Sequence, residues 1–249
     1  MNPTGRFTDR ASDYAAARPS YPAEALDAIF AEMGDAAALT VADLGAGTGI
    51  SSRLLADRGA RVLAVEPNAA MREAAAQHAG VTWLAATAEA TGLDEASVDV
   101  VTVFQAFHWF DHRRALREIV RILRPGGRGA VVYNERDESD PFTAAYGDLV
   151  RHFRTDDTEQ RRADGLEAFA QFEAWHAPRR LRFSNAQELD RDGLVARTRS
   201  SSYLPKEGRA GEELYSELGR LFTQYARDGK VTLLMETIVA RGDTGGDGG

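Results

Sequence analysis

Short apolar stretches that alternate with helical segments constrain the fold of this chain more than any other feature. Each stretch is short enough to be a buried strand. The apolar stretches are residues 41–47, 61–67, 81–87, 98–105 and 127–134. The segments with helical spacing are 21–33, 48–58, 69–78 and 113–123. Apolar strands that alternate with helices form a parallel sheet covered on both faces, and right-handed crossovers make the fold doubly wound. The sequence therefore predicts an α/β protein that binds its ligands beyond the carboxyl ends of the strands.

The second half of the chain has a different rhythm. A length of 249 residues suits one large domain with an inserted cap. We predict a single domain over residues 1–249, built from the following parts. They are a ligand-binding core at 5–134, a cap or substrate segment at 135–210, a closing helix and strand at 211–241, and a disordered tail at 242–249. Within the cap the pattern indicates helices at 143–152 and 165–175 and a strand at 180–183.

Composition excludes several classes of function. The formal net charge is −8, from 38 acidic and 30 basic residues, which argues against a nucleic-acid-binding surface. The chain has no cysteine, so disulfides, thiolate nucleophiles and cysteine-ligated metals are excluded. The start has no apolar signal region, and the longest apolar stretch is far shorter than a membrane span. We therefore expect a cytoplasmic protein without membrane partners, and a mildly basic segment at 150–209 within an acidic chain.

A glycine-rich loop follows the first predicted strand. Residues 43–49 read DLGAGTG, and glycines there permit a tight turn and a close approach by a ligand. Glu66 lies at the end of the second predicted strand, 21 residues after Gly45. A carboxylate at that position can accept hydrogen bonds from both hydroxyls of a ribose. The loop and Glu66 together predict a nucleoside site.

Two details distinguish this loop from a dinucleotide-binding loop. The dinucleotide pattern requires a third glycine or alanine where this chain has Ile50, and the third glycine comes one residue early, at Gly49. Asp43 precedes the loop by two residues, where its carboxylate would be poorly placed beside a pyrophosphate. A ligand with positive charge, such as an amino-acid ammonium group, fits Asp43 better.

Four segments carry a resemblance to a known family. In order and spacing, VADLGAGTG, AVEPNAAM, SVDVVTVFQAFHWFD and LRPGGRGAVVYN resemble the core motifs of class I S-adenosylmethionine-dependent methyltransferases. The match is strongest to the small-molecule type (methyltransferase type 11) that includes ubiquinone/menaquinone-biosynthesis and trans-aconitate methyltransferases, and it covers residues 5–134. The resemblance implies a Rossmann-like, seven-stranded, mostly parallel sheet with an antiparallel last strand and a helical cap. It also implies S-adenosyl-L-methionine as cofactor and S-adenosyl-L-homocysteine as product.

The resemblance also implies which residues hold the cofactor. By position in the motifs these are Asp43, Gly45, Ala46, Gly47, Glu66, Pro67, Asn68, Thr87, Ala88, Glu89, Gln105 and Ala106. The loop would line the methionine part with Asp43 near its ammonium, Glu66 would hold the ribose, and Gln105 would lie under the sulfonium. Members of the family often have Asp at the position of Thr87, so this chain departs from the pattern there. In the opening segment, Tyr14 would cover the cofactor and Arg18 would pair with its carboxylate.

His108 is the candidate general base. It follows the fourth predicted strand, beside the expected point of methyl transfer, and an imidazole suits proton transfer near neutral pH. The alternative is a structural histidine among core aromatics, because the same local pattern recurs in family members with different substrates. His108 and His112 lie four residues apart, but no third ligand is evident, so we predict no metal site.

The acceptor could be bound by polar residues after Asn134. The clusters Arg151/Arg154, Arg161/Arg162 and Arg179/Arg180/Arg182 could hold an anionic substrate, or could form surface ion pairs with nearby acids. Tyr133 and Asn134 end the fifth predicted strand and could face the substrate or pack at the strand end.

Three functions remain open from the sequence. The first is methyl transfer to oxygen, nitrogen or carbon of a small molecule, for instance a carboxylate or a natural-product intermediate, by a monomer or a homodimer. The second is a non-catalytic cofactor-binding protein on the same fold. The third is a nicotinamide-dependent oxidoreductase, which Asp43 and Ile50 disfavour. A protein substrate is a subordinate possibility.

Overall fold

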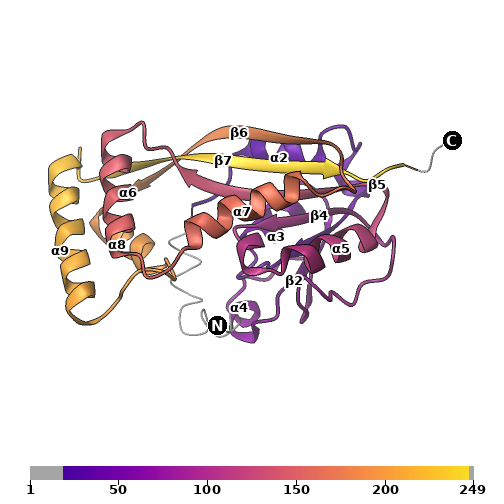
Figure 1. Ribbon diagram of the computed structural model, residues 1–249, viewed down its shortest axis with the longest axis horizontal. Coiled ribbons are helices and arrows are strands. Elements are labelled where there is room, and N and C mark those ends of the chain that lie inside the picture. Colours follow the sequence, from indigo (N-terminus) through magenta and orange to yellow (C-terminus); the bar gives the residue numbers. More distant parts are fainter. Residues whose placement is uncertain (1–18, 247–249) are drawn as a thin grey trace.

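The computed structural model describes residues 19–246, and its centre is one seven-stranded sheet (Figure 1). The strands are β1 (Thr40–Leu44), β2 (Arg61–Val65), β3 (Val81–Leu84), β4 (Val98–Phe104), β5 (Leu123–Arg136), β6 (His176–Leu189) and β7 (Val231–Asp243). Their order across the sheet is β3-β2-β1-β4-β5-β7-β6. β7 runs antiparallel to both of its neighbours, and the other neighbouring pairs are parallel. The predicted fold class, with an antiparallel last strand, is confirmed.

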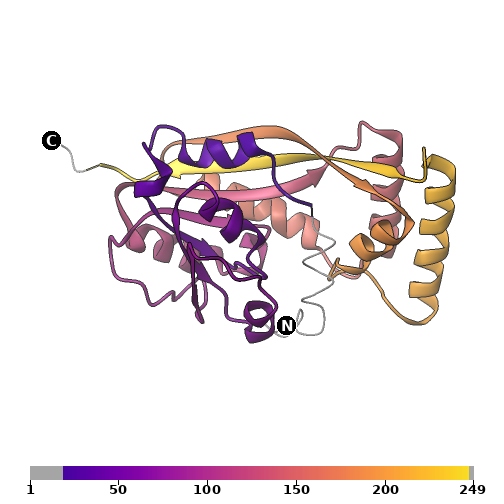
Figure 2. The same cartoon turned by 180° about the vertical axis from the view of Figure 1, so that it is seen from behind.

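Helices cover both faces of the sheet, as the apolar strands require. The helices are α2 (Ala23–Phe30), α3 (Ile50–Ala56), α4 (Ala69–Glu73), α5 (His112–Ile122), α6 (Pro141–Phe153), α7 (Thr158–Ala170), α8 (Arg191–Arg199) and α9 (Gly208–Tyr225), with short 3-10 turns η3 (Ala36–Ala38) and η4 (Phe107–Trp109). Apolar residues of α2 and α3 pack with one side of β1, β2, β4 and β7, and those of α5 and α7 pack on the other side. Figure 1 shows α5 and α7 in front, and Figure 2 shows α2 from behind.

The ends of β6 and β7 carry a second lobe, which we call the cap lobe. It contains α6, α8 and α9 and has its own apolar core, which includes Phe142, Tyr146, Leu194, Leu214 and Leu218. The cap lobe lies at the end of the molecule opposite α5 (Figure 1). This packing differs from the predicted division of the chain. α7 lies in the predicted cap segment but covers the sheet through Leu166 and Phe169, whereas α9, which was expected to close the core, packs on α6.

Some elements are longer or shorter than their sequence patterns indicate. The predicted strand at 180–183 is the middle of β6, which pairs with β7 from Leu189 back to His176. Its exposed side carries Arg180, Arg182 and Ser184 at alternate positions, so the run of apolar residues looks short. α8 has no clear apolar stripe and was missed. α4 ends at Glu73, five residues before the predicted end.

The structure contradicts the start of the disordered tail predicted at 242–249, because Gly242 and Asp243 belong to β7. β7 continues to Asp243, whose carboxylate accepts two hydrogen bonds from the buried guanidinium of Arg128. Gly242 lies opposite Gly129 on β5, and the indole of Trp175 covers both, so that a Cβ at either position would lie 2.6 Å from it. Residues 247–249 lie outside the described residues. None of the helices within residues 19–246 is long and apolar enough to cross a membrane.

Candidate functional site

Two adjoining pockets lie at the carboxyl ends of the parallel strands. The first, the Glu66 pocket, is lined by Gly45, Gly47, Glu66, Pro67, Asn68, Met71, Thr87, Ala88, Glu89, Phe104, Gln105, Ala106, Trp109 and Phe110. The second, the Arg162 pocket, includes Ala46, Thr48, His108, Asn134, Glu135, Arg136, Arg162, Arg197 and Tyr203. Gly45, Gly47, Phe104, Gln105 and Trp109 line both pockets. The pockets therefore meet between the glycine loop and the end of β4.

The glycine loop has the left-handed backbone that its sequence predicts. Gly45, Gly47 and Gly49 have φ values of 67°, 58° and 72°. A Cβ at Gly45 would lie 2.7 Å from the Cβ of Ala106, and one at Gly49 would lie 2.8 Å from the indole of Trp83. Gly47 differs from both, because no described residue has an atom within 4 Å of the place where its Cβ would be. Its missing side chain leaves open space at the junction of the two pockets.

Glu66 lies in its pocket with both carboxylate oxygens directed at backbone amides. Oε2 accepts from the Gly47 amide at 2.9 Å, and Oε1 accepts from the Asn68 amide at 2.8 Å. These bonds tie the end of β2 to the glycine loop and to the start of α4. Burial raises the pKa of the Glu66 carboxyl above its usual value. Each oxygen has a second lone pair, so the carboxylate can also accept hydrogen bonds from a ligand.

Most of the predicted cofactor residues come together at this site. The Glu66 pocket gathers Gly45, Gly47, Glu66, Pro67, Asn68, Thr87, Ala88, Glu89, Gln105 and Ala106, and Ala46 lines the adjoining pocket. Glu89 also accepts a hydrogen bond from the amide of Asp111, so one of its oxygens holds the turn before α5. Tyr14 and Arg18 lie outside the described residues.

Asp43 is placed differently from its prediction. It is fully buried under the loop and lines neither pocket. Its carboxylate accepts hydrogen bonds from the hydroxyls of Ser51 at 2.7 Å, Ser52 at 2.6 Å and Thr102 at 2.9 Å. Burial raises the pKa of Asp43 despite these bonds. Asp43 thus anchors the first turn of α3 to β4. In the sequence, the adjacent Ser51 and Ser52 after the loop were the signal that could have indicated this role.

Gln105 has a strained backbone where the two pockets meet. Its φ is 55°, an uncommon value for a residue with a side chain. The Gln105 amide donates to the carbonyl of Val132 on β5, and its side-chain oxygen accepts from Arg162 at 3.2 Å. Strain of this kind persists only where the surroundings hold it, and it concentrates at functional sites. The strain supports the predicted place of Gln105 beside the reacting centre.

His108 lines the Arg162 pocket and is held by Tyr133. The Tyr133 hydroxyl accepts from the His108 backbone amide at 3.0 Å and lies 3.2 Å from Nδ1 of the imidazole. Tyr133 is fully buried, and burial raises the pKa of its phenol, so the hydroxyl keeps its proton at ordinary pH. His108 therefore has a feature of a structural histidine, because Tyr133 fixes its ring. It also has a feature of a general base, because it borders a pocket. Tyr133 packs at the strand end and supports the histidine.

His112 does not join His108 at the site. Its ring stacks on Phe107 with centroids 4.8 Å apart, and it lines neither pocket. Within residues 19–246, no group of three or more His, Asp or Glu side chains is placed to hold a metal ion.

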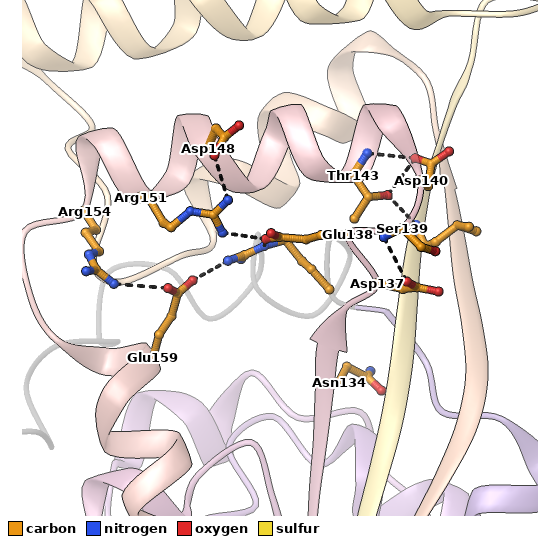
Figure 3. Close-up of polar contacts among 12 residues, drawn as sticks. Asn134, Asp137, Glu138, Ser139, Asp140, Thr143, Asp148, Arg151, Arg154 and Glu159 are labelled. Carbon is orange, nitrogen blue, oxygen red and sulfur yellow. Dashed lines mark hydrogen bonds and ion pairs between the residues drawn. The ribbon is translucent and has the colours of Figure 1, made fainter.

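The arginine clusters divide into surface pairs and one pocket residue. Arg151 pairs with Glu138 at 2.6 Å and Arg154 with Glu159 at 3.1 Å, between α6 and the start of α7 (Figure 3). Arg161 pairs with Asp157 at 2.9 Å. Arg179, Arg180 and Arg182 are exposed on β6. Of the predicted clusters only Arg162 reaches the pocket, where its guanidinium lies 4.9 Å from the ring centre of Tyr133.

Several residues of the Arg162 pocket were not identified from the sequence. They include Tyr21, Arg136, Thr158, Arg197, Tyr203 and Met235. These residues come from β5, α7, α8, β7 and the loops around them, and no local pattern relates them. The basic character of residues 150–209 was the one signal that pointed toward this part of the site.

Comparisons with known proteins agree with the fold and with the resemblance of the core motifs. Residues 42–131 match a family model described as a methyltransferase domain. An uncharacterized methyltransferase of Mycobacterium tuberculosis is 43% identical over 145 residues, which are 58% of this chain and 58% of that protein. The chain thus aligns with less than two thirds of the length of that relative. The match confirms the resemblance stated for the core motifs.

Solved structures share the fold over nearly the whole chain. One is the "Putative Type II Methyltransferase" from Anaeromyxobacter dehalogenans, with a TM-score of 0.66, 24% identity, and coverage of 92% of this chain and 99% of that chain. Another is a phosphoethanolamine N-methyltransferase of Haemonchus contortus in complex with phosphomonomethylethanolamine and S-adenosylhomocysteine. It has a TM-score of 0.54 and 16% identity, and covers 99% of this chain and 61% of that chain.

Proposed function

We propose that this chain, whose residues 42–131 match a methyltransferase domain, transfers a methyl group from S-adenosylmethionine to a small-molecule acceptor. The observation that supports this function best is the pair of joined pockets. One is lined by the Glu66 carboxylate and by Gly47, whose missing side chain leaves open space, and the other is lined by the cap lobe and the sheet. Two pockets that meet at Gln105 suit a reaction between two bound small molecules.

The residues of the Glu66 pocket fit S-adenosylmethionine. Glu66 would accept from the ribose hydroxyls, and Pro67 and Asn68 would flank the adenine, with Thr87 and Ala88 near its edge. The backbone at Gly45, Ala46 and Gly47 would line the methionine part, and the open space beside Gly47 leaves room for it. Asp43 would act through the loop that it anchors, because its carboxylate is already bonded to three hydroxyls.

When bound, S-adenosylmethionine supplies an activated methyl group on a sulfonium. The protein then has to hold the acceptor in line and exclude water. Trp109 and Phe104 border both pockets and would shield the junction. His108 would take a proton from a hydroxyl or acidic-carbon acceptor, and Tyr133 would hold the ring in position. An amine or carboxylate acceptor would need no base.

Titration calorimetry with S-adenosylmethionine, S-adenosylhomocysteine and NAD tests the binding half of the proposal. We expect S-adenosylmethionine and S-adenosylhomocysteine to bind and NAD not to bind. Glu66→Gln should weaken the binding of both S-adenosyl compounds by roughly 10- to 100-fold, because charge-assisted hydrogen bonds are lost. Binding of NAD alone would favour an oxidoreductase.

A screen for transfer of the labelled methyl group to small molecules tests the catalytic half. Formation of a methylated product and S-adenosylhomocysteine supports an enzyme. Tight cofactor binding with no product from a broad extract of metabolites would favour a non-catalytic cofactor-binding protein.

A further inference from the structure

We propose that the acceptor is an organic anion, and that Arg136, Arg162 and Arg197 bind its carboxylate or phosphate group in the Arg162 pocket. The inference rests on the proposed methyl transfer and specifies the chemical class of its substrate. It arises from the distribution of charge between the two pockets, from the contacts of Arg162, and from the way in which Arg136 is held.

The two pockets have opposite charges among the described residues. The charged side chains of the Glu66 pocket are Glu66 and Glu89. The Arg162 pocket has three guanidinium groups, from Arg136, Arg162 and Arg197, against the single carboxylate of Glu135. A low-dielectric cleft lined by one sign of charge attracts ligands of the opposite sign. The Glu66 pocket thus suits a cationic sulfonium compound, and the Arg162 pocket suits an anion.

Arg162 is a buried guanidinium with hydrogen-bonding capacity left over. Only 9% of the residue is exposed, and its Nη2 donates to the carbonyl of Asn134 at 2.9 Å, to Glu135 at 2.9 Å and to Gln105 at 3.2 Å. All of these bonds come from Nη2, although a guanidinium carries five N–H donors. Among the described contacts Nη1 makes no hydrogen bond, so it can donate to an acceptor oxygen of a ligand. The bond to Gln105 places Arg162 next to the junction of the pockets.

Arg136 is held in place by acids that it shares. It pairs with Glu159 and, at 3.4 Å, with Glu138. Glu159 also pairs with Arg154, and Glu138 also pairs with Arg151, as Figure 3 shows. Asp148 pairs with Arg151 as well, so three arginines and three carboxylates form one network that fixes Arg136 in position beside the pocket. A guanidinium fixed in this way loses little side-chain entropy when it binds a carboxylate or phosphate.

Arg197 adds a third guanidinium from the cap lobe. It lies on α8, whereas Arg136 ends β5 and Arg162 lies on α7. The three charges thus reach one pocket from the sheet, from the helix that covers the sheet, and from the cap lobe. An anion bound among them would bridge the two lobes.

The first test compares acids with neutral analogues of the same shape. Carboxylic acids would be assayed against their primary amides, and phosphate monoesters against the parent alcohols, in the wild-type protein with labelled S-adenosylmethionine. We expect methyl transfer to acids or phosphates and little to their neutral partners. The two arms separate carboxylate from phosphate recognition. Preference for the amides or alcohols would overturn the inference.

The second test uses variants of the pocket arginines. Arg136→Gln, Arg162→Gln and Arg197→Gln should each raise the KM of an anionic acceptor by roughly 10- to 100-fold, with the affinity for S-adenosylmethionine unchanged. Arg117→Gln, at an exposed position of α5 outside both pockets, is the matched control and should change neither. Arg136 and Arg197 keep the test valid if loss of Arg162 unfolds the protein. Equal KM values in all four variants would overturn the inference.

If none of the acids and phosphates is methylated, a direct measurement of their binding tests the inference. The protein saturated with S-adenosylhomocysteine would be titrated with the same acids and phosphates by thermal shift. Stabilisation by anions that Arg136→Gln abolishes supports the inference, and no stabilisation by any anion contradicts it. Failure to bind S-adenosylhomocysteine at all would instead refute the proposed function, so the two failures are distinguishable.

Discussion

At the scale of single residues, the glycine loop shows how one backbone conformation serves two purposes. Gly45 and Gly49 lack side chains because Ala106 and Trp83 occupy the space, so both are packing requirements. Gly47 has no described atom within 4 Å of its missing Cβ, as is also true of Gly229, and what distinguishes Gly47 is its place in the lining of both pockets. The sequence motif does not distinguish the three glycines from one another. Their different surroundings in the structure do.

Gly47→Ala should weaken binding of S-adenosylmethionine by roughly 100-fold, because the new methyl group enters the space at the junction of the pockets. Calorimetry measures the affinity. The control is Gly229→Ala in the turn before β7, where φ is 74° and nothing lies within 4 Å. Both variants carry the same left-handed strain of about 1–2 kcal/mol, but Gly229 lies outside the pockets. Equal affinity in the two variants would contradict a ligand role for Gly47.

His108→Gln should lower kcat by roughly 100-fold for a hydroxyl acceptor and leave the affinity for S-adenosylmethionine unchanged, if the imidazole removes the proton. Tyr133→Phe should lower kcat to a smaller degree, because the ring of His108 loses its hydrogen bond to Tyr133 but stays in the pocket. Steady-state kinetics measures both variants. A His108→Gln protein with normal turnover would show that the histidine is structural.

At the scale of elements, α5 holds the loop between β3 and β4 through a single carboxylate. Glu118 accepts hydrogen bonds from the amide and the hydroxyl of Thr91, and it pairs with Arg121, which also donates to the carbonyl of Leu93. The Arg121 hydrogen bonds, followed by those of Thr91, lower the pKa of Glu118 to about 2. This loop follows Thr87, Ala88 and Glu89, so α5 indirectly supports the wall of the Glu66 pocket.

Glu118→Gln should cost about 2 kcal/mol of the free energy of unfolding at neutral pH. The pKa of Glu118 is lower in the folded protein than in the unfolded chain. Its stabilisation is therefore complete above the unfolded value of 4.5 and is lost as the pH falls toward about 2. Urea denaturation at several pH values tests this. The stability difference between wild type and variant should shrink below about pH 4.5, and a constant difference would contradict the role of the charge.

Elements were predictable where their pattern is local. The five core strands and the helices between them were located from apolar periodicity, because the inner strands are largely buried on both faces and each helix is buried on one. β3 is an edge strand that is only half-buried, but its residues are still mainly apolar. β6 was seen only in part, because it is an edge strand with exposed arginines, and its length comes from pairing with the distant β7. α8 was missed because Leu194 and Thr198 are the only residues that it buries.

At the scale of the whole molecule, the site joins two lobes with separate apolar cores. Among the described residues, those that line the Glu66 pocket all lie between positions 45 and 110, within the core. The Arg162 pocket also receives Arg197, Ser202 and Tyr203 from the chain around the cap lobe. Cofactor binding and acceptor binding should therefore depend on different parts of the protein.

Leu218→Ala should affect acceptor binding and leave cofactor binding unchanged. Leu218 is almost fully buried between α9 and the rest of the cap lobe, so its truncation should cost about 2–5 kcal/mol of stability. We expect a higher KM for the acceptor and an unchanged affinity for S-adenosylmethionine, measured at a temperature where the variant is folded. Leu26→Ala in α2 removes a core leucine on the far side of the sheet and should not alter the acceptor KM. An equal rise of the acceptor KM in Leu218→Ala and Leu26→Ala would contradict the dependence of acceptor binding on the cap lobe.

The sequence alone determined where the Glu66 pocket lies. The glycine loop, Glu66, the residues after β3 and Gln105 each follow a strand directly, and neighbouring parallel strands bring their carboxyl ends together. Local spacing is then sufficient to locate a site. Even there, packing decided that Asp43 lies beneath the loop rather than in the pocket.

The Arg162 pocket was decided only by the tertiary structure. Arg136, Arg162, Arg197 and Met235 lie far apart in the chain and meet because β7 turns back beside β5 and carries the cap lobe with it. The physical reason is that long-range strand pairing and helix packing set these neighbours, and neither leaves a periodic signal in the sequence. The same arginine type serves as a surface ion pair at Arg151 and as a pocket residue at Arg162, and burial alone separates the two roles.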